Sequence, residues 1–273
     1  MPARESEALV LRTYPYREAD LIVVFLTRDQ GKLRGVARGV RRPRSRFGAS
    51  LERMAHARIH YFQKQTVELV RVDRGELLGP SLVMPASFPV AVALDALAEL
   101  ADELLPDHEP NDAFFRLLLL AREEISRELQ ADATNGAAAA GWIWRILSYS
   151  VLWAMRLSGW LPPLDVCLET GEPLAAGETA YFQRDRPGLL KASLRTPDSW
   201  ALSAESRALA REMLRAPLPR LSARPWSRDH AADLRRFLEQ RLEAQVEKRL
   251  RSWALLEAFD EPRAAVHARG RSC

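Results

Sequence analysis

The sequence contains very little cysteine: Cys167 and Cys273 are the only two among its 273 residues. They lie far apart and outside any cysteine-rich pattern, which excludes a disulfide framework and favours a reducing compartment, with the cytoplasm as the default. Histidine is also scarce, and the five are scattered along the chain without the spacing of a metal or catalytic site (His56, His60, His108, His230 and His267).

Motifs of the common enzyme classes are missing. The sequence has no Walker A phosphate loop, no G-x-G-x-x-G, no H-E-x-x-H and no G-x-S-x-G. Glu18, Asp20 and Glu52 are carboxylates of the kind that bind metal in nucleases, but predicted strands and loops separate them, and we expect them to pair with nearby arginines. We therefore predict a protein that is not an enzyme, has no cofactor and acts through binding energy alone.

Long uninterrupted apolar runs are also absent. Residues 141–160, GWIWRILSYSVLWAMRLSGW, have the length of a membrane span but contain Arg145 and Arg156. We interpret this segment as the buried central helix of a bundle, and we expect no membrane association. The N-terminus, MPARESEALVLRTY, has acids beside its first apolar run and no long apolar region, so it does not resemble a signal peptide.

The residues that are present describe a globular protein with an uneven charge. Hydrophobic residues make up 47% of the chain, which is ample for a buried core, and the length favours one large or two ordinary domains. Residues 1–80 carry sixteen Lys and Arg against nine Asp and Glu, while the whole chain has a net charge of only +4. The basic character therefore belongs to the N-terminal third.

Most of that charge lies in residues 32–46, KLRGVARGVRRPRSR. This basic segment has no acid and seven cations, namely Lys32, Arg34, Arg38, Arg41, Arg42, Arg44 and Arg46. Gly35, Gly39, Pro43 and Gly48 favour a loop over a helix, and guanidinium groups suit bidentate contacts with phosphate. The segment therefore predicts a site for nucleic acid; the alternative is a solvated, flexible surface loop.

The flanking sequence favours the nucleic-acid interpretation, because it predicts five short strands within about seventy residues. Apolar or alternating runs occupy residues 7–12, 19–28, 32–38, 57–63 and 66–72. Such a series fits a small Greek-key barrel of the OB type, which binds single strands through a charged groove and stacked aromatic rings. Tyr14, Tyr16 and Phe47 fall in predicted loops and are candidates for stacking; either Tyr61 or Phe62 belongs to the core, because adjacent strand residues face opposite ways.

The composition becomes helical after residue 80. Helical patterns cover residues 90–105, the segment after Asn111 and Asp112, residues 141–160, residues 204–215 and residues 228–259. A stretch rich in proline and glycine, residues 160–195, interrupts them. The charges of the last helix are expected to form i, i+4 pairs on a solvated face, or else a surface for an acidic partner; they are Arg235, Arg236, Arg241, Lys248, Arg249 and Arg251, with Glu239, Glu243 and Glu247.

This order of parts resembles the RecO family of bacterial recombination mediators. The most specific stretch is EALVLRTYPYREADLIVVFLTRDQGKLRGVARGVRRPRSRFGASLE, with Glu18 and Asp20 before the second strand, the turn at residues 27–31, and Arg38-Gly39 at the start of the basic segment. SGWLPPLDVCLETGEPL is similar to the family's helix end before its insert. The resemblance implies an α+β, multi-domain protein: an OB-fold β-barrel over residues 1–80, then a mainly α-helical domain over residues 81–273, with a zinc-ribbon-like insert at residues 160–195.

The insert departs from the zinc-binding members of that family. Where they carry two C-x-x-C pairs, this chain has Cys167, Thr170, Lys191 and Leu194, so three of the four positions lack a thiolate. A structural zinc site needs four suitable ligands, so we predict no metal. We expect hydrophobic residues to hold the insert instead, namely Leu164, Leu174, Tyr181, Phe182, Leu189 and Leu190.

The resemblance also implies a function in repair of DNA damage. It implies a mediator of homologous recombination that binds single- and double-stranded DNA, anneals complementary strands without ATP and is associated with the nucleoid in the cytoplasm. The implied partners are RecR, the acidic C-terminal tail of single-stranded DNA-binding protein, with the helical domain as its expected place, and indirectly RecA. Two alternatives stay open: an adaptor that uses the OB barrel to bind proteins, and an RNA-binding factor.

Overall fold

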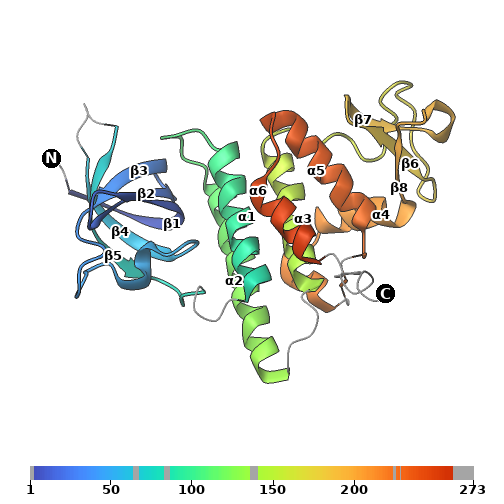
Figure 1. Cartoon of the computed structure of the whole chain (residues 1–273). Helices are drawn as coiled ribbons and strands as arrows, with labels where there is room; N and C mark the ends of the chain where they lie inside the picture. Colours follow the sequence, from blue (N-terminus) through green and yellow to red (C-terminus); the bar gives the residue numbers. More distant parts are fainter. Residues whose placement is uncertain are drawn as a thin grey trace, which may run out of the picture.

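A computed structural model describes residues 3–63, 68–82, 87–135, 141–223, 226–227 and 229–260. Figure 1 shows a β-barrel at one end of the molecule, a layer of helices in the middle, and a small sheet at the opposite end. The fold is therefore the predicted one: an OB-like barrel followed by a helical region with a small insert.

Five strands close the barrel. They are β1 (Ala3–Tyr16), β2 (Asp20–Thr27), β3 (Gly31–Ala37), β4 (His56–Phe62) and β5 (Val70–Leu77), with the short 3-10 helix η1 (Gly48–Leu51) between β3 and β4. The order around the barrel is β1-β2-β3-β5-β4, and β3 pairs with β5 in parallel. This connectivity is that of a five-stranded Greek-key barrel.

Alternation along the strands gives the barrel a core of its own. Val10, Val23 and Phe25 point inward together with Tyr61, which is buried and meets Phe25 edge to face at 6.0 Å between ring centroids. Phe62, the next residue, therefore faces outward. The alternative that the sequence left open is settled with Tyr61 in the core.

The outer surface of β1 and β2 forms a second core with the helices. Leu9, Leu11, Val24 and Leu26 are all buried, and they pack in one cluster with α1 (Phe88–Leu104). Because side chains of both faces of these two strands are buried, their sequences are almost continuously apolar. The barrel is thus fixed to the helical layer.

Two strands, β1 and β5, differ from their predicted bounds by more than one residue. β1 does not end at residue 12: it continues to Tyr16, pairing Tyr14 with Ile22 and Tyr16 with Asp20. Since β4 pairs only with residues 3–9 of β1, Pro15 lies on a free edge where its missing N–H costs nothing. The fifth strand, predicted over residues 66–72, begins at Val70 and ends at Leu77; residues 66–67 lie outside the described part.

The helical layer is built around α3 (Gly141–Leu157), which packs against α1 and α2 (Asp112–Asn135). As predicted, α3 is buried along nearly its whole length. Its Arg145 is buried and donates to the carboxylates of Glu124, at 3.0 Å, and Glu128, at 2.5 Å, so the charge is compensated within the layer. None of the helices in the described residues is long and apolar enough to span a membrane.

The last predicted helix is wrong as a single element. It is α5 (Ala232–Val246) followed by α6 (Arg251–Asp260), and Glu247 between them has a left-handed φ of 56°. The cause is distant in sequence: the Glu99 carboxylate accepts the N–H groups of Arg251, at 3.1 Å, and Ser252, at 2.9 Å, and so caps the start of α6.

The expected i, i+4 pairs also fail for several charges of this region. Lys248 pairs with Glu103 of α1, and Arg249 pairs with Glu243 six residues earlier. Arg241 is buried and donates to backbone carbonyls of the insert, including Gln183 at 2.5 Å. Lys248 and Arg241 therefore connect this region to α1 and to the insert, instead of lying on a solvated helix face.

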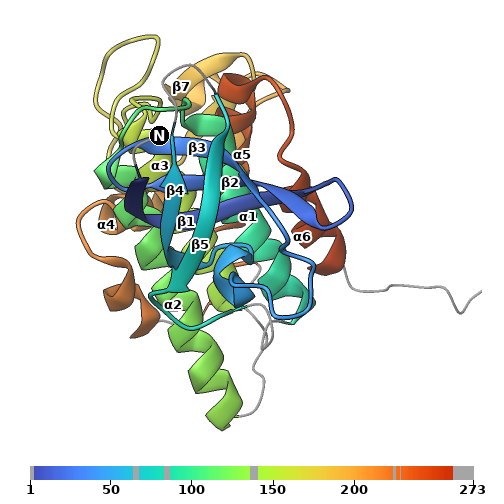
Figure 2. The ribbon, with the colours of Figure 1, turned by 90° about the vertical axis from the view of Figure 1, so that its left-hand side faces the viewer.

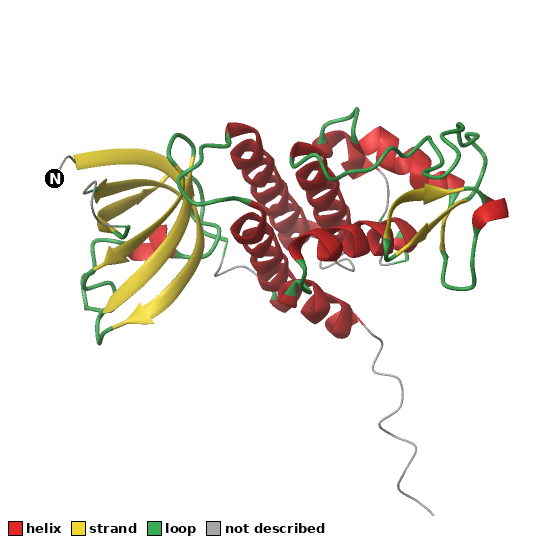
Figure 3. Cartoon of the chain, turned by 90° about the horizontal axis from the view of Figure 1, so that it is seen from above, coloured by secondary structure: helices red, strands yellow, loops and turns green. Residues whose placement is uncertain are grey.

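The insert forms a three-stranded sheet at the end away from the barrel (Figure 3). Its strands are β6 (Ala180–Gln183), β7 (Arg186–Leu190) and β8 (Trp200–Leu202), with η2 (Ala192–Leu194) after β7, and it leads into α4 (Ala204–Met213) and η3 (Leu218–Ala223). Five of the six residues expected to hold it are buried; Tyr181 is half-buried, with the Arg195 guanidinium 5.7 Å from its ring centroid. Arg207 of α4 adds backbone contacts, donating to the carbonyls of Leu164 at 3.1 Å and Glu178 at 2.7 Å.

The four positions compared with the cysteines of zinc-binding family members do not fit zinc. Cys167 is buried, but the Lys191 ammonium is bonded to Glu172 at 2.6 Å and Leu194 offers no ligand atom. Within the described ranges, no three His, Cys, Asp or Glu side chains gather as metal ligands would. The arrangement of this insert therefore depends on packing and hydrogen bonds.

Candidate nucleic-acid interface

The basic segment is attached to the tip of the β1–β2 hairpin. The N–H of Gly39 donates to the Asp20 carboxylate at 2.8 Å, and the N–H of Arg41 donates to the carbonyl of Ala19 at 3.2 Å. Gly39 has a φ of +69°, a conformation that glycine adopts without strain. The loop that follows β3 therefore has a defined place beside the hairpin.

This attachment corrects one expectation about the acids. Asp20 binds a backbone N–H rather than an arginine side chain, and Glu52 accepts a hydrogen bond from the Ser81 hydroxyl at 2.5 Å. Both carboxylates stabilise loop geometry. They leave the guanidinium groups of the segment unneutralised.

Four arginines of the segment remain exposed. Arg38, Arg41, Arg42 and Arg44 have exposed side chains, and none of them forms an ion pair with another described residue. Arg34 and Arg46 are also exposed but lie near carboxylates, 3.4 Å from Asp107 and 3.3 Å from Asp73 respectively. The structure thus brings six of the seven predicted cations to the surface of the barrel, and four of these have no carboxylate partner in the part of the chain that it describes.

Lys32 is the exception, and its assignment to the interface is wrong. Its side chain is buried, with only 5% of the residue exposed, between the barrel and α1. The ammonium donates to the carbonyl of Asp102 at 2.6 Å and forms ion pairs with the carboxylates of Asp102 and Asp107, each at 3.3 Å. Strand alternation turns Lys32 toward the helical layer, so it stabilises the junction and is inaccessible to a ligand.

Of the three aromatic candidates for stacking, two are exposed and one is buried. Tyr14 and Tyr16 are 41% and 36% exposed on the outer face of β1, although they lie in a strand and not in the predicted loop. Phe47 is only 3% exposed and belongs to the barrel core beside Leu51. A stacking role for Phe47 is therefore wrong: the turn into η1 directs its ring into the barrel core.

The register of the barrel identifies further surface residues that the sequence did not single out. Tyr14 is opposite Ile22, Ile22 is opposite Val36, Val36 is opposite Arg71, and Arg71 is opposite Phe62. We call this row of five the outer strip. All five are at least partly exposed, and the Arg71 guanidinium lies 4.4 Å from the Phe62 ring centroid. Alternation alone gives the outward direction of each residue, but only the strand order puts them in one row.

The outer strip lies where OB barrels bind oligonucleotides. That face is formed by the second and third strands and bordered by the loops after the first and fourth. Ile22 and Val36 supply half-buried apolar surface, and Tyr14 supplies an exposed ring. Arg34 of β3 and Arg38, directly after β3, are exposed on either side of Val36 in sequence. Apolar contact for bases beside cations for phosphates is the combination that single strands require.

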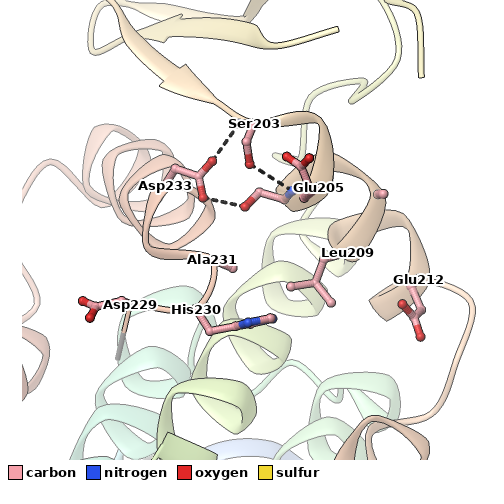
Figure 4. A pocket seen from close by; sticks show the side chains of 10 residues that line it. Ser203, Glu205, Leu209, Glu212, Asp229, His230, Ala231 and Asp233 are labelled. Carbon is pink, nitrogen blue, oxygen red and sulfur yellow. Dashed lines mark hydrogen bonds between the residues drawn. The ribbon is translucent and has the colours of Figure 1, made fainter. Parts of the chain in front are cut away.

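A cavity at the other end of the molecule has the opposite charge. It has a volume of about 720 Å³ and lies between α4 and the start of α5 (Figure 4). Its lining includes the carboxylates of Glu205, Glu212, Asp229 and Asp233. Although burial opposes it, hydrogen bonds from Ser206 and Ser203 lower the pKa of Asp233, so this carboxylate is charged at neutral pH. Such a cavity repels phosphate, so it is not a candidate site for nucleic acid.

Comparison with known proteins agrees with this architecture. The family model described as "Recombination protein O N terminal" matches residues 1–81, and that described as "Recombination protein O C terminal" matches residues 90–254. A protein named DNA repair protein RecO from Koribacter versatilis is 42% identical over 257 residues, covering 94% of this chain and 99% of the relative. Its namesake from Bifidobacterium adolescentis is 32% identical over 260 residues, covering 94% of this chain and all of the relative. This chain therefore belongs to the RecO family of DNA repair and recombination proteins.

Proposed function

We propose that the protein binds single- and double-stranded DNA through the basic segment and the outer strip, and that it anneals complementary strands without ATP. The observation that carries the proposal is the exposure of Arg38, Arg41, Arg42 and Arg44 on a loop fixed to the barrel. A cluster of like charges without carboxylate partners is best stabilised by a polyanion. Binding to phosphates releases counterions, so the affinity is strongly dependent on salt and independent of sequence.

Annealing follows from the same electrostatics. Two complementary strands repel each other through their phosphates, and cations placed between or beside them lower that repulsion. The outer strip holds unpaired bases by stacking, which keeps them exposed to a second strand. Because binding alone lowers the repulsion between the strands, annealing requires no nucleotide hydrolysis.

The family supports further proposals about partners and place. We propose that the protein acts in the cytoplasm at the nucleoid, contacts the acidic C-terminal tail of single-stranded DNA-binding protein, and with RecR helps to load RecA onto DNA coated by that protein. A pull-down with single-stranded DNA-binding protein, with and without its last residues, tests the tail contact. Capture that is independent of those residues contradicts it.

The DNA-binding proposal is tested with the variant Arg38→Ala/Arg41→Ala/Arg42→Ala/Arg44→Ala. The salt slope is the slope of the logarithm of the binding constant against the logarithm of the salt concentration. For a single strand its magnitude is about 0.7 for each phosphate contact, so the loss of four contacts lowers it by about 2.8. At 0.1 M salt this corresponds to a several-hundredfold weaker affinity. Fluorescence anisotropy of a labelled oligonucleotide at several salt concentrations measures both quantities.

A matched control removes four exposed arginines elsewhere: Arg156, Arg195, Arg215 and Arg220. The two variants have the same net charge. Equal loss of binding in both would be explained by net charge alone, and would contradict a site on the barrel. An RNA of equal length and composition provides the second comparison. Tighter binding of RNA than of DNA favours the RNA-binding alternative.

A further inference from the structure

A groove runs between the barrel and the last helix. It has a volume of about 480 Å³, and we call it the β1–α6 groove. Arg12 and Tyr14 of β1 form one side. Arg249, just before α6, and Arg251 and Leu255 of α6 form the other. Figure 2 shows the β1–β2 hairpin and α6 on the same side of the molecule. The groove is therefore formed jointly by the two halves of the chain.

The groove is cationic after its own carboxylates are accounted for. Asp95 forms an ion pair with Arg53, and Glu103 forms one with Lys248. The remaining carboxylate in the lining, Glu99, is occupied by the two backbone N–H groups at the start of α6. Glu99 keeps its charge but is only 8% exposed. The cations of the lining therefore outnumber its three carboxylates; they are Arg12, Arg53, Lys248, Arg249 and Arg251.

Two arginines of the lining stay accessible to a ligand. Arg251 is exposed, and its side chain forms no ion pair with any residue that the structure describes. Arg249 has one partner, Glu243 at 3.3 Å, but its side chain is 76% exposed, and such surface pairs are weak. A phosphate can replace or share this contact at little cost.

The groove is continuous with the proposed DNA-binding face. Tyr14 belongs both to the outer strip and to the groove lining, and its hydroxyl accepts a hydrogen bond from Arg12 at 3.3 Å. The hairpin that carries Tyr14 also holds the basic segment through Ala19 and Asp20. The hairpin therefore has the basic segment at its tip and the groove along the side of β1.

We propose that the β1–α6 groove binds the phosphodiester backbone of a second single strand while the basic segment holds the first. The inference rests on the proposed annealing function and assigns its second site. An annealing protein must hold two polyanions close together, and one cationic surface would be saturated by one of them. The hairpin separates the two tracks, and Tyr14 lies on the shared edge where bases of both strands can meet.

The test is the variant Arg249→Ala/Arg251→Ala in the full chain. Two short, non-complementary oligothymidines with donor and acceptor dyes report capture of both strands by energy transfer, and anisotropy of one strand at low concentration reports the first site. We expect single-strand affinity to be unchanged. Capture of the second strand weakens about 25-fold at 0.1 M salt, and its salt slope falls in magnitude by about 1.4, as two lost phosphate contacts require.

Three outcomes would overturn the inference. One is unchanged capture of the second strand. Another is equal weakening of both measurements, because the groove would then belong to the first site. The third is loss of affinity for an aspartate-rich peptide with intact two-strand capture, which would make the groove a site for an acidic protein segment. A wild-type protein that binds no oligothymidine contradicts the proposed function itself and is recognised before the variant is measured.

The control variant Arg195→Ala/Arg215→Ala changes the charge equally on exposed residues of the insert and the segment after α4. Full two-strand capture is expected for it, and a matching loss there overturns the assignment. Folding is checked by thermal unfolding. Arg251 contributes its backbone N–H to the cap on Glu99, so alanine keeps the cap, and Arg249→Gln/Arg251→Gln provides a second pair if the first is unstable.

Discussion

Buried arginines connect the parts of this chain through backbone carbonyls. Arg122 of α2 donates to the carbonyl of Met54 at 2.9 Å and to that of Pro80, next to the segment that links barrel and helices. Arg207 and Arg241 do the same for the insert. Burial lowers the pKa of all three guanidinium groups, but an arginine stays protonated in proteins. Each one therefore acts as a rigid set of donors that holds turns, strand ends or irregular segments in place.

Asp233 is a partly buried carboxylate whose contribution to stability depends on pH. Its carboxylate accepts hydrogen bonds from the N–H of Ser203 at 2.7 Å and from the Ser206 hydroxyl at 2.5 Å. Burial raises its pKa, but these hydrogen bonds outweigh burial and the pKa is lowered. Asp233→Asn should therefore reduce the free energy of unfolding by about 1–2 kcal/mol at neutral pH.

The pH dependence of that loss follows from the direction of the shift. A carboxylate with a lowered folded pKa stabilises the fold at pH values above its unfolded pKa of about 4, and this stabilisation is lost as the pH falls through the folded pKa. The difference in unfolding free energy between wild type and Asp233→Asn should thus shrink below about pH 4. Urea titrations between pH 3 and pH 7 measure it, and a constant difference contradicts the assignment.

Substitution of two aromatic residues in different elements should have opposite effects on stability and on DNA binding. Phe47 leads into η1 and lies in the barrel core, whereas Tyr14 lies on the exposed half of β1. Phe47→Ala should destabilise the protein by about 3–4 kcal/mol, as other large-to-small core substitutions do. Tyr14→Ala should leave stability nearly unchanged and weaken binding of a single strand by about 1–3 kcal/mol through lost stacking.

Urea unfolding and oligonucleotide anisotropy on the same two variants separate these effects. A Phe47→Ala protein of wild-type stability would show that the ring is not part of the core. A Tyr14→Ala protein of wild-type affinity would remove Tyr14 from the interface, while the basic segment could still bind phosphates.

Several elements could be predicted from the sequence because their signals are local. Alternation gave the strands of the barrel, and the apolar sequence with two arginines gave the buried α3. The break after α5 could not be predicted, because the carboxylate that caps α6 belongs to Glu99, about 150 positions earlier in the chain. The outer strip could not be predicted for a similar reason: Arg71 is opposite Val36 only because β3 and β5 pair in parallel.

Within the basic segment, too, the sequence predicted the position of some cations but not of others. Their number and the glycines around them indicate an exposed loop, and Arg38, Arg41, Arg42 and Arg44 are exposed. Lys32 has the same charge but faces α1, where Asp102 and Asp107 receive it. Which side of β3 meets the helical layer depends on packing between the two halves of the chain, and no pattern within residues 32–46 contains that information.

Across the whole molecule, the barrel is held to the helices by a junction that Lys32 completes. Lys32→Met removes the buried ammonium and leaves the Asp102 and Asp107 carboxylates without it. Breaking a buried pair costs about 3–5 kcal/mol, and because both carboxylates are partly solvated we expect a loss of about 2 kcal/mol in unfolding free energy.

DNA binding should respond differently, because Lys32 is inaccessible. The salt slope for a single strand should be the same for Lys32→Met as for wild type, in contrast to the fall expected for the four exposed arginines. Chemical denaturation and anisotropy on one preparation test both statements. A slope reduced by about 0.7 would return Lys32 to the DNA-binding set.

The acidic cavity beside α4 and the arginine-rich barrel lie at opposite ends of the molecule (Figure 1). If the protein binds DNA as proposed, the phosphates of the strand attract the barrel end and repel the acidic cavity during approach. On that proposal, encounters in which the barrel faces the strand are favoured over encounters in which the helical end faces it. Reversing a few of the distant carboxylates would therefore slow productive encounter even though none of them touches the strand.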